Sequence, residues 1–137
     1  MRQFFLVIAF IFSGLYLIGQ KKWMVSKDGN GQFTTVQAAL DAVPKNNKEP
    51  IVIFIKEGVY KEKLHLDSTK NFVTLEGESK FNTILTYSDH SGKIAPTGET
   101  INTRTSWSFI IRSDDFKAFN LTFENNAGFT AGQAVAV

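Results

Sequence analysis

The feature that most constrains the fold is a succession of short apolar segments with no helix between them. The first, residues 51–55 (Ile-Val-Ile-Phe-Ile), is an uninterrupted apolar run, typical of a strand that is covered on both faces. Further short runs follow, with Gly, Asn, Asp or Ser in the connections: residues 59–60, 64–66, 72–75, 84–87, 109–111 and 119–123. Because no helical period separates successive strands, a layered strand–helix–strand fold is excluded.

A single helix is expected, and it precedes these strands. The apolar residues of 36–43 fall at the i, i+3, i+4, i+7 spacing of one helical face. Thr34 or Thr35 can cap its start, and Pro44 stops it. A short strand at Val25 runs into the glycine-containing loop before the helix.

Two all-β architectures remain, an antiparallel sandwich and a parallel β-helix. The two turn-forming pairs, Asp28-Gly29 and Asn30-Gly31, precede the helix, so neither links two strands as a hairpin would require. The long polar stretch 88–105 is typical of the one connection per coil that varies in length, and the helix would cover the open end of a coil stack. The pattern leaves both architectures open.

The N-terminus has the pattern of a secretory signal peptide. Arg2 precedes an apolar run over residues 4–18, which is shorter than the about 20 residues that a membrane-spanning helix needs. We therefore expect a signal peptide at residues 1–20, a secreted or periplasmic protein, and no stable membrane association after cleavage. An uncleaved anchor is the alternative. The chain has no cysteine, so no disulfide supports the fold.

Charge gives no indication of a nucleic-acid partner. Arg2, Lys21 and Lys22 belong to the leader region, and the rest of the chain has 12 basic and 13 acidic side chains. The near-neutral charge of this part of the chain gives no support to nucleic-acid binding.

The titratable residues do not form a complete catalytic set by pattern alone. His65, in Leu-His-Leu, is interpreted as a strand histidine that points away from its neighbours. The segment 88–91 (Ser-Asp-His-Ser) resembles a triad only superficially, because triad members come from separated segments, and it is expected to be a solvated loop. Residues 28–31 lack the later carboxylates of a calcium loop, so no metal site is expected.

Four ordered motifs are similar to the pectinesterase (pectin methylesterase) family. Residues 28–44 (DGNGQFTTVQAALDAVP) resemble its opening segment, and 58–62 (GVYKE) its G-x-Y-x-E signature. Residues 120–128 (NLTFENNAG) resemble N-[IL]-T-F-x-N-x-A-G, and 132–137 (GQAVAV) resemble its Q-A-V-A-L stretch. The set resembles a bacterial-type member and covers nearly the whole chain after the leader.

The resemblance implies a right-handed parallel β-helix of the pectin-lyase-like type, with an N-terminal capping helix. It also implies hydrolysis of methyl esters of galacturonosyl units in pectin, with release of methanol and without a metal or other cofactor. In the family one aspartate attacks the ester and a second acts as general acid and then base.

The resemblance further implies that Gln133 is catalytic and contacts the substrate, because a glutamine in the Q-A-V-A-L motif stabilises the oxyanion of the tetrahedral intermediate. Loss of one such donor typically costs about 3 kcal/mol of barrier. The alternative for Gln133 is an amide ladder or a polar strand end. A second substrate contact is placed at Thr103 by counting back from Phe116, with Thr105 as the alternative if the loop shifts by two residues.

Three residues of the 58–62 motif are expected to have structural roles. Gly58 fits a turn with positive φ, Tyr60 can pack its ring while its hydroxyl hydrogen-bonds, and Glu62 can bind backbone donors.

The two aspartates of the family, and the arginine and tryptophan that contact galacturonate, fall in motifs beyond residue 137. Residues 21–137 are therefore expected to be the N-terminal part of a longer pectinesterase domain, monomeric when complete, and this chain alone is expected to be inactive. Two alternatives remain: another β-helix polysaccharide enzyme such as a lyase, or a non-catalytic pectin-binding β-helix.

Overall fold

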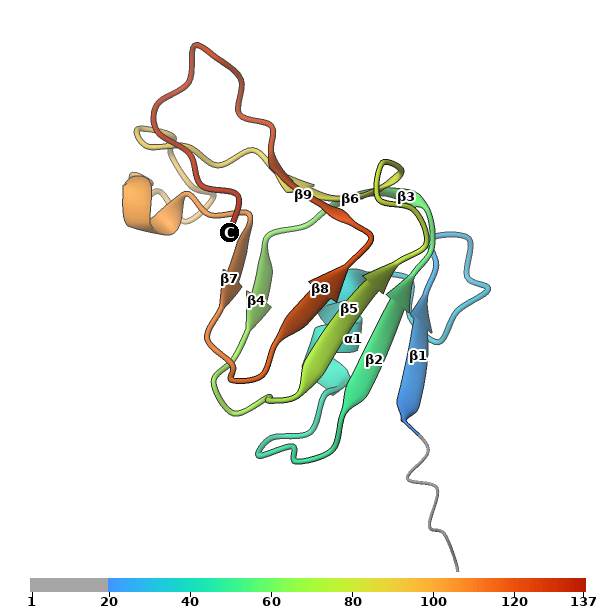
Figure 1. Cartoon of the computed structure of the whole chain (residues 1–137). Coiled ribbons are helices and arrows are strands. Elements are labelled where there is room, and N and C mark those ends of the chain that lie inside the picture. The colour runs from blue at the N-terminus through green and yellow to red at the C-terminus, as the bar shows by residue number, and fades with distance from the viewer. Residues whose placement is uncertain (1–19) are drawn as a thin grey trace, which may run out of the picture.

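The computed structural model describes residues 20–137, in which one helix and nine strands form a stack of coils (Figure 1). The signal peptide predicted at 1–20 lies outside the described residues except for its last position. No helix among the described residues has the length and apolar character to cross a membrane. The elements are β1 (Lys21–Val25), α1 (Val36–Ala42), β2 (Ile51–Ile55), β3 (Gly58–Lys61), β4 (Leu64–Leu66), β5 (Val73–Gly77), β6 (Thr83–Tyr87), β7 (Phe109–Ile111), β8 (Lys117–Phe119) and β9 (Thr122–Asn125), with a 3-10 turn at Thr103–Thr105.

All pairings between these strands are parallel, and they form three sheets, β1-β2-β5-β8, β3-β6-β9 and β4-β7. The chain visits each sheet once per coil: β2, β3 and β4 make one coil, and β5, β6 and β7 the next (Figure 1). This is a parallel β-helix, so the predicted all-β fold is confirmed and the antiparallel sandwich is excluded. The polar stretch 88–105 leaves the stack between β6 and β7, as predicted.

The core lies inside the stack, where residues in register on successive coils contact one another. Ile53 pairs with Leu75, and Leu64 pairs with Phe109; all four side chains are buried. Burial of each such side chain is worth about 1.5–3 kcal/mol. Because the chain has no disulfide, this ladder of apolar contacts carries the stability of the fold.

Helix α1 covers the first end of the core and is fixed at its N-terminus by two side chains. Thr35 is the N-cap, and its hydroxyl accepts a hydrogen bond from the backbone N–H of Ala38 (3.2 Å). The carboxylate of Glu62 accepts from the backbone N–H groups of Val36 (3.0 Å) and Gln37 (2.9 Å). These contacts satisfy donors that a helix leaves unpaired, so the structural role predicted for Glu62 is confirmed.

Gln37 also closes an open edge of the third sheet. Its side-chain oxygen accepts from the backbone N–H of His65 (2.9 Å), and its amide donates to the backbone oxygen of His65 (3.1 Å). The amide thus takes the place of a neighbouring strand beside β4. The flanking Leu64 and Leu66 are buried and His65 is half-buried, which agrees with the predicted outward position of His65.

The other two residues predicted to be structural behave as expected. Gly58 has φ of 152°, a conformation that disfavours other residues. Tyr60 is 1% exposed, and its hydroxyl donates to the backbone oxygen of Lys56 (3.0 Å).

Residues 119–123 do not form the single strand that the apolar pattern predicts. β8 ends at Phe119, and β9 begins at Thr122 in the next sheet. Asn120 makes the corner with φ of 54°, and its side chain donates to the backbone oxygens of Gly77 (2.9 Å) and Glu78 (3.1 Å). The apolar pattern does not reveal this corner, because asparagine tolerates the left-handed conformation and can turn the chain inside an apolar run. The first strand also differs, since β1 ends at Val25 rather than starting there.

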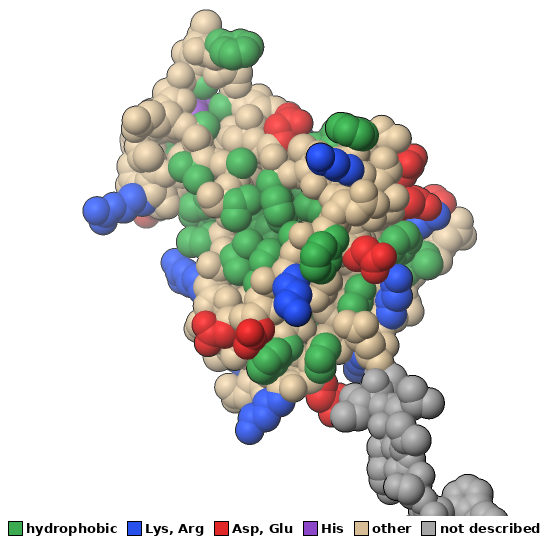
Figure 2. All heavy atoms as spheres, in the orientation of Figure 1, with side chains coloured by type: hydrophobic (Ala, Val, Ile, Leu, Met, Phe, Trp, Pro, Cys, Tyr) green, Lys and Arg blue, Asp and Glu red, His purple; other side chains and the backbone are tan. Residues whose placement is uncertain are grey.

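The far end of the stack has no helix over it among the described residues. Figure 2 shows hydrophobic side chains gathered at the centre of the face that carries β7, β8 and β9. Phe116, Leu121 and Phe123 pack against the core and are only partly buried, and Phe119 is 56% exposed. In the described part of the chain, no strand pairs with the outer edge of β8 or β9.

Candidate active site

Thr103 and Gln133, which the family resemblance predicts to contact the substrate, lie against each other. Thr103 begins the 3-10 turn in the excursion between β6 and β7, and Gln133 lies in the segment that follows β9. The hydroxyl of Thr103 donates to the side-chain oxygen Oε1 of Gln133 at 2.9 Å, although 30 positions separate them. Both residues are exposed to solvent.

This contact orients the Gln133 amide. Because Oε1 accepts from Thr103, the two hydrogens of Nε2 are left for other partners, and Nε2 donates to no group within residues 20–137. The NH2 of this exposed side chain is therefore oriented through its own carbonyl oxygen and is left as a hydrogen-bond donor. Such a donor can stabilise an oxyanion that develops beside it.

The backbone around Gln133 also contacts neighbouring segments. The backbone oxygen of Gln133 accepts from the N–H of Ser91 (2.7 Å). A Cβ at Gly132 would lie 2.2 Å from the backbone oxygen of Ser91, so the two segments approach closely only because residue 132 is glycine. Val135 then pairs with Trp107 in parallel, which brings this segment alongside the start of β7.

Thr105, the alternative substrate contact, makes its hydrogen bonds with Asn102 instead of Gln133. The Thr105 hydroxyl accepts from the N–H of Asn102 (3.0 Å) and donates to its backbone oxygen (3.2 Å), closing a capping box around the 3-10 turn. Of the two candidates, the structure brings only Thr103 to Gln133.

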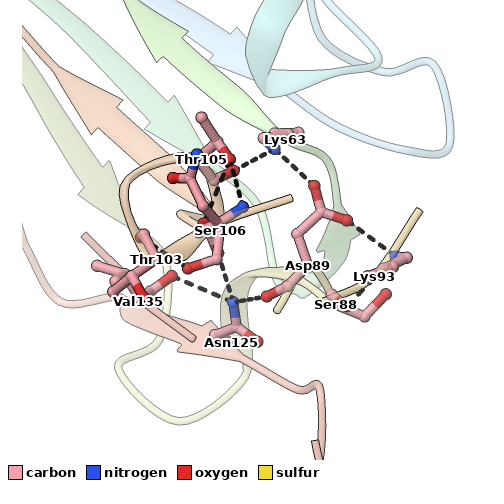
Figure 3. Close-up of polar contacts among 10 residues, drawn as sticks. Lys63, Ser88, Asp89, Lys93, Thr103, Thr105, Ser106, Asn125 and Val135 are labelled. Atoms are coloured by element: carbon pink, nitrogen blue, oxygen red, sulfur yellow. Dashed lines mark hydrogen bonds and ion pairs between the residues drawn. The ribbon is translucent and has the colours of Figure 1, made fainter. Parts of the chain in front are cut away.

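A buried acid anchors the excursion that carries Thr103. The Asp89 side chain is 7% exposed, and its two oxygens bind Lys63 (2.5 Å) and Lys93 (2.8 Å) (Figure 3). Burial raises the pKa of the Asp89 carboxyl, but the hydrogen bonds from both lysines outweigh this effect and the net pKa lies below its usual range. Asp89 is therefore ionised at neutral pH, and the expectation of a solvated loop at 88–91 is wrong at this position.

Lys63 connects this anchor to the far end of the excursion. Besides Asp89, its ammonium binds the backbone oxygen of Thr105 at 2.8 Å and lies over the ring of Trp107, 4.5 Å from the centroid. The side chain of His90 contacts the backbone oxygen of Ser91 instead of a carboxylate, so residues 88–91 do not assemble a triad.

The sequence does not reveal the pairing of Asp89 with Lys63, because the two residues are 26 positions apart and the pattern at 88–91 indicates only a solvated loop. Asn125 has a sequence signal, because it lies in the 120–128 motif. Within residues 20–137, no carboxylate hydrogen-bonds to Thr103 or Gln133, and no group of three His, Cys, Asp or Glu side chains is placed to hold a metal ion.

Comparison with known proteins places this arrangement in one family. A family model described as Pectinesterase matches residues 22–137. "Probable pectinesterase/pectinesterase inhibitor 23" of Arabidopsis thaliana is 42% identical over 114 residues, covering 83% of this chain and 19% of that protein. The chain spans between 19% and 38% of the length of such curated relatives.

Solved structures agree with the sequence relatives. "Pectin methylesterase from Carrot" matches with a TM-score of 0.72 and 34% identity, covering 87% of this chain and 35% of that one. A pectin methylesterase "in complex with hexasaccharide VII" matches with a TM-score of 0.74 and 30% identity, covering 83% and 37%. The family match over most of the chain, the parallel coils and the four ordered motifs lead to one conclusion: the chain belongs to the pectinesterase family.

Proposed function

We propose that this chain forms one side of the active site of a pectin methylesterase, a carboxylic ester hydrolase. The substrate is methylesterified homogalacturonan, and the products are methanol and the free galacturonate carboxylate. The observation that carries the proposal is the contact between Thr103 and Gln133, which orients the amide of this exposed side chain and leaves its NH2 as a donor. The match to a relative solved with a hexasaccharide supports a carbohydrate substrate.

In the proposed mechanism, Gln133 acts when the ester carbonyl becomes tetrahedral. The carbonyl oxygen then gains negative charge, and Nε2 of Gln133 donates to it more strongly than it did to the neutral ester. A donor of this kind contributes about 3 kcal/mol to lowering the barrier. Thr103 fixes the amide so that Nε2, rather than Oε1, faces this oxygen.

We assign the nucleophile and the acid–base group to aspartates in the part of the family protein that this chain does not span. Two observations support further coils beyond residue 137. The chain covers at most 38% of the curated relatives compared, and β8 and β9, beside the apolar face, have free edges within the described residues on which another coil would stack. Residues 21–137 would then be the N-terminal coils, and residues 1–20 a signal peptide that directs the protein to the periplasm or the medium.

Methanol release from highly methylated pectin tests this proposal. A protein that joins residues 20–137 to the aspartate-bearing coils should release methanol, whereas the 137-residue chain alone should not. Turnover by the chain alone would contradict the assignment of the aspartates. Unsaturated products that absorb in the ultraviolet, without methanol, would identify a lyase instead.

A further inference from the structure

Asn125, at the end of β9, contacts three segments that are far apart in the sequence. Its side-chain nitrogen Nδ2 lies 2.8 Å from the backbone oxygen of Asp89, 3.0 Å from that of Ser106 and 3.2 Å from that of Val135 (Figure 3). Asp89 begins the excursion between β6 and β7, Ser106 ends it, and Val135 belongs to the segment that follows Gln133. A single amide therefore links both ends of the excursion to that segment.

This contact replaces backbone pairing that the excursion interrupts. Between β6 and β7 the chain leaves the coil, and the backbone oxygens of Asp89 and Ser106 accept from no backbone N–H within residues 20–137. Buried backbone oxygens without a donor are costly, and the NH2 of Asn125 supplies the donor. The side-chain oxygen of Asn125 in turn accepts from the N–H of Ala127 (3.0 Å), which fixes the orientation of the amide.

Two of the residues that accept from Asn125 lie next to the candidate active-site pair, one near Thr103 and the other near Gln133. Ser106, whose backbone oxygen accepts from Asn125, donates from its hydroxyl to the backbone oxygen of Thr103 at 2.9 Å. Val135, the third acceptor, lies two positions after Gln133. Asn125 thus ties the segment of Thr103 to that of Gln133, in addition to the backbone hydrogen bonds from Ser91 to Gln133 (2.7 Å) and from Ser108 to Val135 (3.0 Å).

We infer that Asn125 is a positioning residue of the active site, which holds the segment of Thr103 against that of Gln133 so that the Gln133 amide faces the substrate. The inference rests on the proposed esterase function. Asn125 itself does not touch the reacting atoms. Its loss lets the donor move away from the position of the oxyanion.

The expected effect is on kcat. Misplacement of a catalytic group by about 1 Å can cost on the order of 100-fold in rate. Asn125→Ala should therefore lower kcat by about 10- to 100-fold while KM changes less than about 3-fold, since the donor acts chiefly in the transition state.

Asn47 offers a matched control because it makes the same kind of contact away from the site. It is 9% exposed, and its Nδ2 donates to the backbone oxygens of Glu49 and Asn71, both at 2.7 Å, in the turn before β2. Asn47→Ala should lower the melting temperature comparably and leave kcat unchanged. Ser106→Ala, which removes only the hydroxyl bonded to Thr103, is a milder second variant and should lower kcat without loss of the fold.

The experiment uses the complete esterase and compares the wild type with Asn125→Ala, Ser106→Ala and Asn47→Ala. Methanol release gives kcat and KM, thermal melts give stability, and nitrogen-15 labelling of glutamine reports the side-chain NH2 signals of Gln133. The inference predicts that kcat falls and the Gln133 signals shift in the first two variants only. Equal kcat loss in Asn125→Ala and Asn47→Ala, or unshifted Gln133 signals in Asn125→Ala and Ser106→Ala, would overturn it. If the wild type releases no methanol, the proposed function fails, and the Gln133 signals alone still decide the positioning role.

Discussion

Replacing Asp89 with asparagine tests the ionic anchor of the excursion. The substitution keeps the size of the side chain but removes the charge that binds the ammonium groups of Lys63 and Lys93. Hydrogen bonds between charged groups are each worth about 1.5–3 kcal/mol, so complete loss of both would cost about 3–6 kcal/mol.

The solvent exposure of the two lysines reduces this expected loss of stability. The side chains of Lys63 and Lys93 are 27% and 33% exposed, so water can solvate both ammonium groups in the variant. Lys63 also keeps its bond to the backbone oxygen of Thr105 and its position over the ring of Trp107. We therefore expect Asp89→Asn to lower the free energy of unfolding by about 2–3 kcal/mol, roughly half the full loss.

Urea denaturation of the variant and the wild type measures this difference, and a thermal melt should show a shift of about 10 °C for a domain of this size. Glu76→Gln is the control, because it breaks an ion pair with Lys22 (3.1 Å) whose side chains are 41% and 55% exposed. Exposed pairs contribute at most about 1 kcal/mol. If Asp89→Asn costs no more than Glu76→Gln, the excursion is not held by this anchor.

Three further predictions follow from particular contacts. Glu62→Gln weakens the carboxylate bonds at the start of α1 and should cost about 1–2 kcal/mol in urea denaturation; an unchanged midpoint would refute the capping role. Gly132→Ala places a Cβ 2.2 Å from the backbone oxygen of Ser91 and should destabilise by about 1–3 kcal/mol, whereas Gly98→Ala, with no atom within 4 Å, reports only the strain of positive φ. Because the pKa of Asp89 is lower in the folded state, the stability that its charge contributes is complete above the ordinary value of 3.8 and is lost as pH falls below it. The melting temperatures of the wild type and Asp89→Asn should therefore converge between pH 7 and pH 2, and a constant difference between them would contradict this.

The elements that the sequence predicted well are those governed by local patterns. The apolar run of β2 and the Leu-His-Leu of β4 have the expected bounds, and Thr35 caps the helix before Pro44 as its position suggested. A side chain's place inside or outside a coil depends on alternation along one strand, which the sequence displays directly.

The features that the sequence did not predict depend on how successive coils stack. Asp89 meets Lys63 across 26 positions, and Asn125 meets Asp89 across 36, so neither contact leaves a local signature. The corner at Asn120 was hidden because apolar residues continue on both sides of it. Thr103 was placed by counting along a family motif, and its contact with Gln133 emerged only from the folded excursion.

The most direct test of the proposed esterase function is methanol release by the full-length protein with and without the Gln133 side-chain amide. Gln133→Ala should lower kcat by about 100- to 1,000-fold, with a much smaller change in KM, because the lost donor acts on the oxyanion of the transition state. Asn47→Ala, measured in parallel, should retain the wild-type kcat. An unchanged kcat in Gln133→Ala would refute the oxyanion role of this amide.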